Sequence, residues 1–141
     1  MIRRAAWIAL ACAVAMPARA WSPETNYRLH CEGCHLADGS ATPGKVPALS
    51  GSVARFAGSA DGRAYLVRVP GVANAALADA DLAALLDWTL RRFDAVHLPP
   101  DFVPFTPEEV GRLRREPLVD VTDARRHLLG KHRGPSPGGT R

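Results

Sequence analysis

The clearest pattern of apolar and polar positions along the chain lies between residues 79 and 93. Large side chains recur there every three or four residues, which is the spacing of one helix face. The positions are Leu82, Leu85, Leu86, Thr89 and Phe93. Acidic residues precede this stretch and arginines end it, as the dipole of a helix favours. The pattern predicts an amphipathic helix over 79–93 whose apolar face packs in a core.

A second helix start lies near residue 22. Serine caps helix N-termini and proline is favoured at the first helical position, so Ser22 and Pro23 predict a helix that runs into Cys31. Tyr27 lies four residues before Cys31, so both project from the same face. Trp88, on the later helix, is placed to reach Tyr27.

Between these two helices, glycines and prolines predict a loop over residues 36–51. Shorter patterns predict a short helix or turn over 51–62 and a short helix over 64–69. A turn over 69–72 then leads into the helix at 79–93.

The compact part is expected to end at residues 97–100, which include two prolines. Beyond it, Thr106 and Pro107 open a capping box and a short helix to about Arg115. Residues 121–131 predict one more helix, capped by Thr122 or Asp123. The tail at 132–141 is rich in glycine, proline and serine and is expected to be disordered.

A chain of 141 residues allows one small domain with appendages, and its first twenty residues have the anatomy of a secretory signal. Two arginines precede a short apolar run, and Ala18-Arg19-Ala20 is an A-x-A cleavage site. The expected organisation is a signal peptide at 1–20, a compact domain at 21–95, a Pro-rich and helical extension at 96–131 and a tail at 132–141. Export to the periplasm follows.

Cleavage after residue 20 changes the composition. It removes three arginines, which leaves 15 basic and 14 acidic residues, so the basic charge of the precursor does not indicate nucleic-acid binding. Residues 21–111 carry a net charge of −4 and residues 112–141 a net charge of +5. Cleavage also removes Cys12 and both methionines, Met1 and Met16.

The remaining cysteines form the pattern Cys31-Glu32-Gly33-Cys34-His35. This spacing lets two sulfurs reach the two vinyl groups on one edge of a porphyrin, and the following imidazole can bind the iron. A thioredoxin-like motif would need a strand before it, and a zinc site would need two more nearby Cys or His ligands. The sequence therefore predicts one covalently attached haem, with Cys31 and Cys34 as attachment points and His35 as proximal ligand.

Two residues of the following loop also fit this site. The carbonyl of Pro47 can accept a hydrogen bond from the second ring nitrogen of His35, which would fix its tautomer. Leu49 would then cover the haem. His30 shares the short helix of the cysteines, so it is expected at the surface or the haem edge rather than as the second ligand.

Together these segments resemble the class I cytochrome c family, over about residues 22–94. The resemblance rests on four features: an aromatic residue four before C-x-x-C-H, the pattern P-x-L-x-G, a turn, and a final helix ending in tryptophan. The matching residues are Tyr27, Cys31 to His35, Pro47, Leu49, Gly51, and Leu77 to Trp88. The family implies an all-α fold wrapped around one covalent haem, working as an electron carrier outside the cytoplasm.

The chain departs from the family on the distal side of the iron. Most members bind it there with a methionine just ahead of the final helix, and the matching residue here is Val69. Three alternatives remain open: a distal histidine, another donor, or no protein ligand. Among histidines His97 is best placed, and His127 or His132 would need the extension to fold back. The other candidate donors are Lys45, Asn74 and Tyr65.

These features predict a periplasmic monohaem cytochrome, an electron carrier rather than an enzyme. Its partners would be a periplasmic oxidoreductase or another cytochrome, met transiently, with no nucleic acid and no stable membrane insertion after cleavage. The alternative is a haem protein that binds small ligands, or acts like a peroxidase, at an open distal site. The extension is expected to be dispensable for haem attachment and to steer partner docking by its charge.

Overall fold

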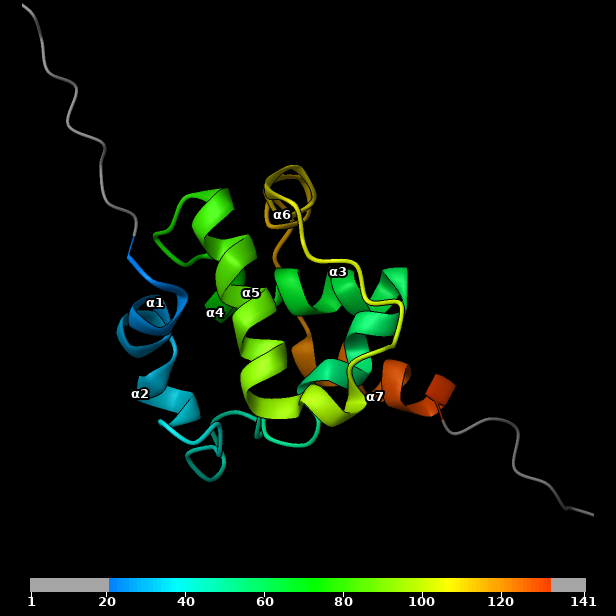
Figure 1. Cartoon of the computed structure of the whole chain (residues 1–141). Helices are drawn as coiled ribbons and strands as arrows, with labels where there is room; N and C mark the ends of the chain where they lie inside the picture. The colour runs from blue at the N-terminus through cyan, green and yellow to red at the C-terminus, as the bar shows by residue number, and fades with distance from the viewer. Residues whose placement is uncertain (1–20, 133–141) are drawn as a thin grey trace, which may run out of the picture.

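The computed structural model describes residues 21–132, and the fold of this range is entirely helical, without a strand (Figure 1). The α-helices are α1 (Pro23–His30), α2 (Glu32–His35), α3 (Ala60–Arg68), α4 (Pro70–Ala73), α5 (Asp79–Asp94), α6 (Pro107–Leu113) and α7 (Val121–His132). Two 3-10 helices are η1 (Val53–Gly58) and η2 (Ala95–His97). The predicted all-α fold is confirmed. The signal peptide and most of the predicted tail lie outside the described residues.

Helix α5 is the central element, as its apolar pattern predicted. It contacts α1 on one side and α6 on the other, and it also contacts η1 (Figure 1). Its inward residues are almost inaccessible to solvent: Leu82, Leu85, Leu86, Leu90 and Phe93. Trp88 meets Tyr27 of α1 with ring centroids 5.4 Å apart, so the expected contact between the two helices is confirmed.

The start of α1 follows its capping residues. The Oγ atom of Ser22 accepts a hydrogen bond from the backbone N–H of Thr25 at 3.1 Å, and Pro23 is the first helical residue. The cap satisfies a backbone donor that the helix cannot use internally. The predicted helix start is confirmed.

Two local predictions were wrong. The expected turn at 69–72 contains the one-turn helix α4, because Pro70 presets the backbone angle of a first helical residue. Thr122 or Asp123 was predicted as the cap of α7, but the cap is Asp120. Its Oδ1 accepts a hydrogen bond from the N–H of Asp123 at 2.7 Å. Helix α7 therefore begins ahead of both residues that the sequence offered as caps.

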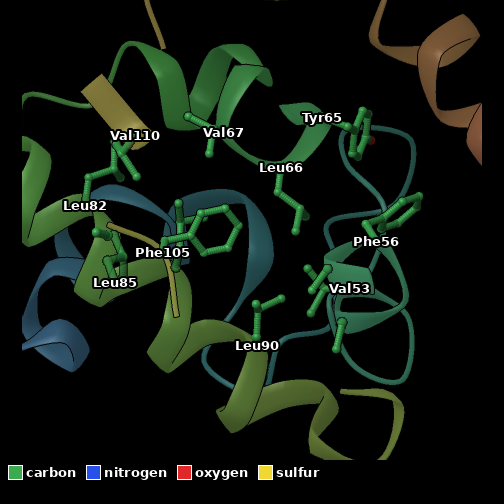
Figure 2. Close-up of a cluster of buried hydrophobic side chains, with 14 of the residues drawn as sticks. Val53, Phe56, Tyr65, Leu66, Val67, Leu82, Leu85, Leu90, Phe105 and Val110 are labelled. Carbon is green, nitrogen blue, oxygen red and sulfur yellow. The ribbon is translucent and has the colours of Figure 1, made fainter. Parts of the chain in front are cut away.

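The compact part does not end at residues 97–100. Phe105, Val110 and Leu128 of the extension are 5%, 0% and 6% exposed and belong to the same buried cluster as the residues of α5. Figure 2 shows Val110 pointing toward Val67 of α3 and Leu82 of α5. The extension therefore completes the hydrophobic core, where we expected an appendage.

Arg63 of α3 fastens the extension at its first turn. It donates to both carboxylate oxygens of Glu109, from Nε at 2.8 Å and Nη2 at 2.5 Å, and its Nη1 donates to the carbonyl of Val103 at 2.8 Å. Its guanidinium lies 3.9 Å from the ring centroid of Phe105. The backbone N–H of Phe105 in turn donates to Asp87 of α5 at 3.0 Å. Burial raises the pKa of Asp87, and this hydrogen bond opposes the rise.

Candidate functional site

The two cysteines and the histidine of the motif lie on one turn of backbone, with Cys31 between α1 and α2 and the other two residues in α2. The N–H groups of Cys34 and His35 both donate to the carbonyl of Cys31, at 3.1 Å and 3.0 Å. Cys31 is half-buried and Cys34 exposed, and neither forms a disulfide. Burial raises the pKa of the Cys31 thiol to about 11, so it stays protonated at neutral pH.

Tyr27 holds the end of this turn from beneath. Its buried hydroxyl donates to the carbonyl of Leu36 at 2.7 Å and to that of His35 at 3.2 Å. Burial raises the pKa of Tyr27 to about 12, with a smaller contribution from Cys31, so the hydroxyl remains a donor. The sequence predicted the position of this ring but not the role of its hydroxyl group.

His35 is kept neutral and has a ring nitrogen without a partner. Burial lowers its pKa, and the nearby carbonyl of Pro47 opposes that fall. The buried Nδ1 atom nevertheless forms no hydrogen bond of acceptable geometry. Neutral imidazole is the form that binds a metal, so this residue suits an iron ligand.

The loop after the motif is folded against the end of α5. The N–H groups of Leu49 and Ser50 donate to the carbonyl of Gly39, at 2.8 Å and 3.1 Å. Gly39 has φ +74°, and a Cβ atom on it would overlap the Phe93 ring, so only glycine fits. This close approach brings Leu49 to the edge of the core, where it is half-buried.

Several apolar side chains from both halves of the domain border the core and remain half-buried. They are Cys31, Leu49, Val69, Val72, Ala75 and Leu77. On the surface near the motif, Leu29 and Leu36 are 64% and 41% exposed. A large apolar group such as a porphyrin would remove such side chains from water, so the residues present fit a haem.

The two alternative interpretations of the motif fit less well. A thioredoxin-like site would require a strand before the motif, and no strand precedes the motif within residues 21–132. Over the same range, no group of three or more His, Cys, Asp and Glu side chains converges as a metal site would need. His30 is exposed beside the cysteines, as expected.

The candidate distal donors lie in different environments. Tyr65 is buried, with its ring centroid 5.0 Å from that of Phe56, whereas Asn74 and Lys45 are exposed. Val69 is half-buried at the start of α4. His127 is exposed on α7, and the side chain of His132 lies outside the described structure.

His97, the predicted distal candidate, has both ring nitrogens engaged. Its Nδ1 lies 2.5 Å from Oδ1 of Asp94, and its Nε2 is bonded to the guanidinium of Arg55. Asp94 is 2% exposed, and its second oxygen accepts from the N–H of Ala54 at 2.8 Å. This cluster joins η1 to the end of α5. Iron ligation by His97 stays a prediction, and it would require these bonds to break.

A second polar atom near the motif lacks a partner. Asn26 of α1 is 1% exposed, and its Oδ1 accepts no hydrogen bond. Neither this residue nor the buried Asp94 was singled out from the sequence. The periodicity of a helix predicts which positions are buried, but it does not predict the role of a polar residue at such a position.

Comparison with known proteins decides the family. The chain is 33% identical over 107 residues to cytochrome c-552 of Thermus thermophilus, covering 63% of this chain and 82% of that protein. The chain belongs to the c-type cytochrome family. A second cytochrome c-552 from the same species gives the same identity over 107 residues, with 72% of its length covered. No protein-family model matches the chain.

Membership of this family makes electron transfer the general function and covalently bound haem the cofactor of the cytochrome. The helical fold agrees with it. Among residues 21–132, no helix has the length and apolar composition needed to cross a membrane.

Proposed function

We propose that this cytochrome carries single electrons outside the cytoplasm through one haem, attached at Cys31 and Cys34 with His35 as proximal ligand. The observation that supports the assignment most directly is the state of the motif. Two unpaired thiols lie one turn apart, beside a neutral imidazole whose buried Nδ1 lacks a hydrogen-bond partner. The bound haem would supply the one-electron change between ferric and ferrous iron.

The chain's own residues would orient the group and exclude water from it. The thiols would fix its position along α1 and α2, and Pro47 would accept a hydrogen bond from Nδ1 of His35, which raises the basicity of the other nitrogen. Tyr27 would keep the turn rigid through its two carbonyl contacts. Leu49 and Val69 would cover opposite parts of the haem surface.

The decisive test is expression of the full chain in a host that exports proteins and attaches c-type haem. We expect haem to remain with the protein after acid-acetone extraction. The intact mass should equal that of the chain from Trp21 onward plus one haem. Extraction of all the haem would contradict covalent attachment, and a retained signal sequence or a second haem would contradict those parts of the proposal.

The partner would be a periplasmic oxidoreductase or another cytochrome, bound transiently through a small interface. The net charge of +5 after residue 111 favours an acidic partner surface. The rate of electron exchange with an acidic redox protein should then fall as salt is added, because the charges are screened. A rate that does not depend on salt would exclude this steering.

A second function is favoured by the position of the methionines and by the bonds of His97. Both methionines of the sequence lie at or before residue 16, and both ring nitrogens of His97 are engaged. An open iron site would bind carbon monoxide or another small ligand and would be high-spin in at least one oxidation state. Peroxidase-like activity would further need a distal acid or base. The near-infrared band of methionine-ligated ferric haem would rule out the open site.

A further inference from the structure

The cytochrome carries an arginine in its C-terminal extension whose contacts all lie in the segment joining α4 to α5. Arg114 follows α6, and its side chain is only 16% exposed. Its Nε donates to the carbonyl of Ala73 at 3.0 Å, and its Nη1 donates to the carbonyl of Leu77 at 2.8 Å. Its Nη2 donates to the carbonyl of Ala75. Nη1 also lies 3.1 Å from Oδ1 of Asp79, the first residue of α5.

The segment has few other means of keeping its shape. Residues 74–78 lie between two helices and have mostly small side chains, of which Ala75 and Leu77 pack against the edge of the core. The backbone bonds within this stretch are short-range turns, such as that from Leu77 N–H to the carbonyl of Ala75 at 2.8 Å. The carbonyls of Ala75 and Leu77, and that of Ala73 at the end of α4, bond to a single guanidinium, whose planar fork can serve several acceptors at once. Charge-assisted bonds of this kind are stronger than neutral ones.

A glycine of α6 lies close to the same contact. A Cβ atom on Gly111 would overlap Oδ2 of Asp79, so a side chain there would displace the carboxylate that Arg114 contacts. The extension also holds the end of α3, since Leu118 N–H donates to the carbonyl of Arg68 at 2.8 Å. Arg68 Nε returns a bond to the carbonyl of Glu116 at 2.6 Å. The extension thus fastens both the end of α3 and the segment before α5.

The resemblance to class I cytochromes would place Val69, ahead of this segment, on the distal side of the haem. Val69 and Val72 before the segment and Leu77 within it are half-buried at the edge of the core, as are Cys31 and Leu49 of the attachment side. Held in place, this segment would then close one side of the bound haem. Released, it would leave that side open to small molecules from solvent.

We propose that Arg114 is a positioning residue that holds the segment from Ala73 to Asp79 closed and so limits the access of small ligands to the distal face of the haem. This proposal rests on the proposed haem attachment. It assigns to the C-terminal extension a role in controlling the iron site, in addition to its part in the core.

The experiment compares the wild-type holoprotein with Arg114→Ala and Arg115→Ala. Arg115 is the matched control, because it has the same charge, is exposed and forms no hydrogen bond or ion pair with any described residue. Two quantities are measured: amide hydrogen exchange at Ala75 and Leu77, and the rate of carbon monoxide uptake by the reduced protein. Arg114→Ala should raise both by on the order of tenfold, from the loss of several charge-assisted bonds, and Arg115→Ala neither.

Equal behaviour of the two variants would overturn the proposal, as would faster exchange without faster ligand uptake. If Arg114→Ala does not fold, Arg114→Lys replaces it, because lysine keeps the charge but lacks the planar fork. Its exchange and uptake rates should both exceed those of the wild type, and wild-type rates would overturn the proposal. Acid-acetone extraction of each sample tests covalent haem attachment separately from the role of Arg114. Loss of haem from the wild type would contradict the proposed function and not the role of Arg114.

Discussion

The attachment region at residues 31–52 and the C-terminal extension at residues 98–132 differ in how they are held. In the attachment region, α2 has no buried residue, and the loop after it is held mainly by backbone bonds around Gly39. The extension instead contributes three buried side chains to the core and is fastened by two arginines, Arg63 and Arg114.

The difference shows which part of the domain can stand without its cofactor. Half-buried apolar side chains and an unpaired Nδ1 atom on His35 mark the attachment region as incomplete. In the described part of the extension and in the helices it covers, α3 and α5, no buried side-chain nitrogen or oxygen lacks a hydrogen-bond partner. We therefore expect loss of haem to disorder mainly the attachment region. Loss of buried side chains should destabilise mainly the extension and the helices it covers.

The largest effect is expected from the double variant Cys31→Ala/Cys34→Ala. Without thiols no covalent bond can form, so acid-acetone should extract all haem from it. The haem supplies the apolar partner that the attachment region lacks, so the apoprotein should lose order mainly there, with residues 31–52 exchanging their amide hydrogens fastest. His30→Ala, which changes an exposed neighbour of Cys31, is the control and should keep its haem. Haem retained by the double variant would contradict the assignment.

Truncation after Ala95 should be nearly as damaging. It removes Phe105, Val110 and Leu128, each worth about 1.5–3 kcal/mol when fully buried. Their sum of roughly 4–9 kcal/mol is comparable with the whole stability of a small domain, so little folded protein should form. Thermal unfolding and the yield of haem-loaded protein measure this against a chain ending at His132. A truncated holoprotein with unchanged melting temperature would restore the expectation that the extension is dispensable.

A smaller, pH-dependent effect is expected from Glu109→Gln. The hydrogen bonds from Arg63 lower the pKa of Glu109 below its usual 4.5, and the two side chains are only 20% and 16% exposed. Because the folded pKa is the lower one, this carboxylate stabilises the fold above about pH 4.5. That contribution disappears as the pH falls through the lowered pKa.

Urea unfolding should therefore show a loss of about 1.5–3 kcal/mol in Glu109→Gln at neutral pH, a typical value for hydrogen bonds to charged groups. The difference from wild type should shrink as the pH falls below about 4.5 and through the lowered pKa of Glu109. Glu108→Gln is the matched control, since its side chain is exposed next to Glu109. A pH-independent difference would show that the ion pair is not its cause.

The smallest effect is expected from Arg28→Ala on α1. Its pair with Glu24 has a length of 2.6 Å, much like that of Arg63 with Glu109, but the side chains are 67% and 55% exposed. Solvent screens such a pair, so the free energy of unfolding should change by no more than about 0.5 kcal/mol. An effect as large as that of Glu109→Gln would mean that burial does not determine how much each ion pair contributes to the free energy of unfolding.

The features that the sequence predicted are those whose cause is local. The cap at Ser22, the helix at α5 and the spacing of Cys31, Cys34 and His35 each depend on residues a few positions apart. Their physical signals therefore lie within one or two helical turns of sequence. The contact of Trp88 with Tyr27 followed because both helices were already predicted.

The features that were missed depend on contacts between distant parts of the chain. Phe105 sits in a stretch without helical periodicity, so its burial gave no local signal. Arg114 meets carbonyls 37–41 positions earlier in the sequence, and backbone carbonyls carry no residue identity that a pattern could reveal. Asp94 lies just past the helix predicted at 79–93, and only the packed structure places Ala54 and His97 against it.

The packing of the extension also has a consequence for the order in which the protein matures. A chain emerges from synthesis N-terminus first, so Cys31 and Cys34 arrive long before Leu128. The core lacks its last buried side chain until then. During this interval the core is incomplete, and haem could be joined to an open chain. The late arrival of the extension would thus give the attachment reaction time to finish before the domain closes.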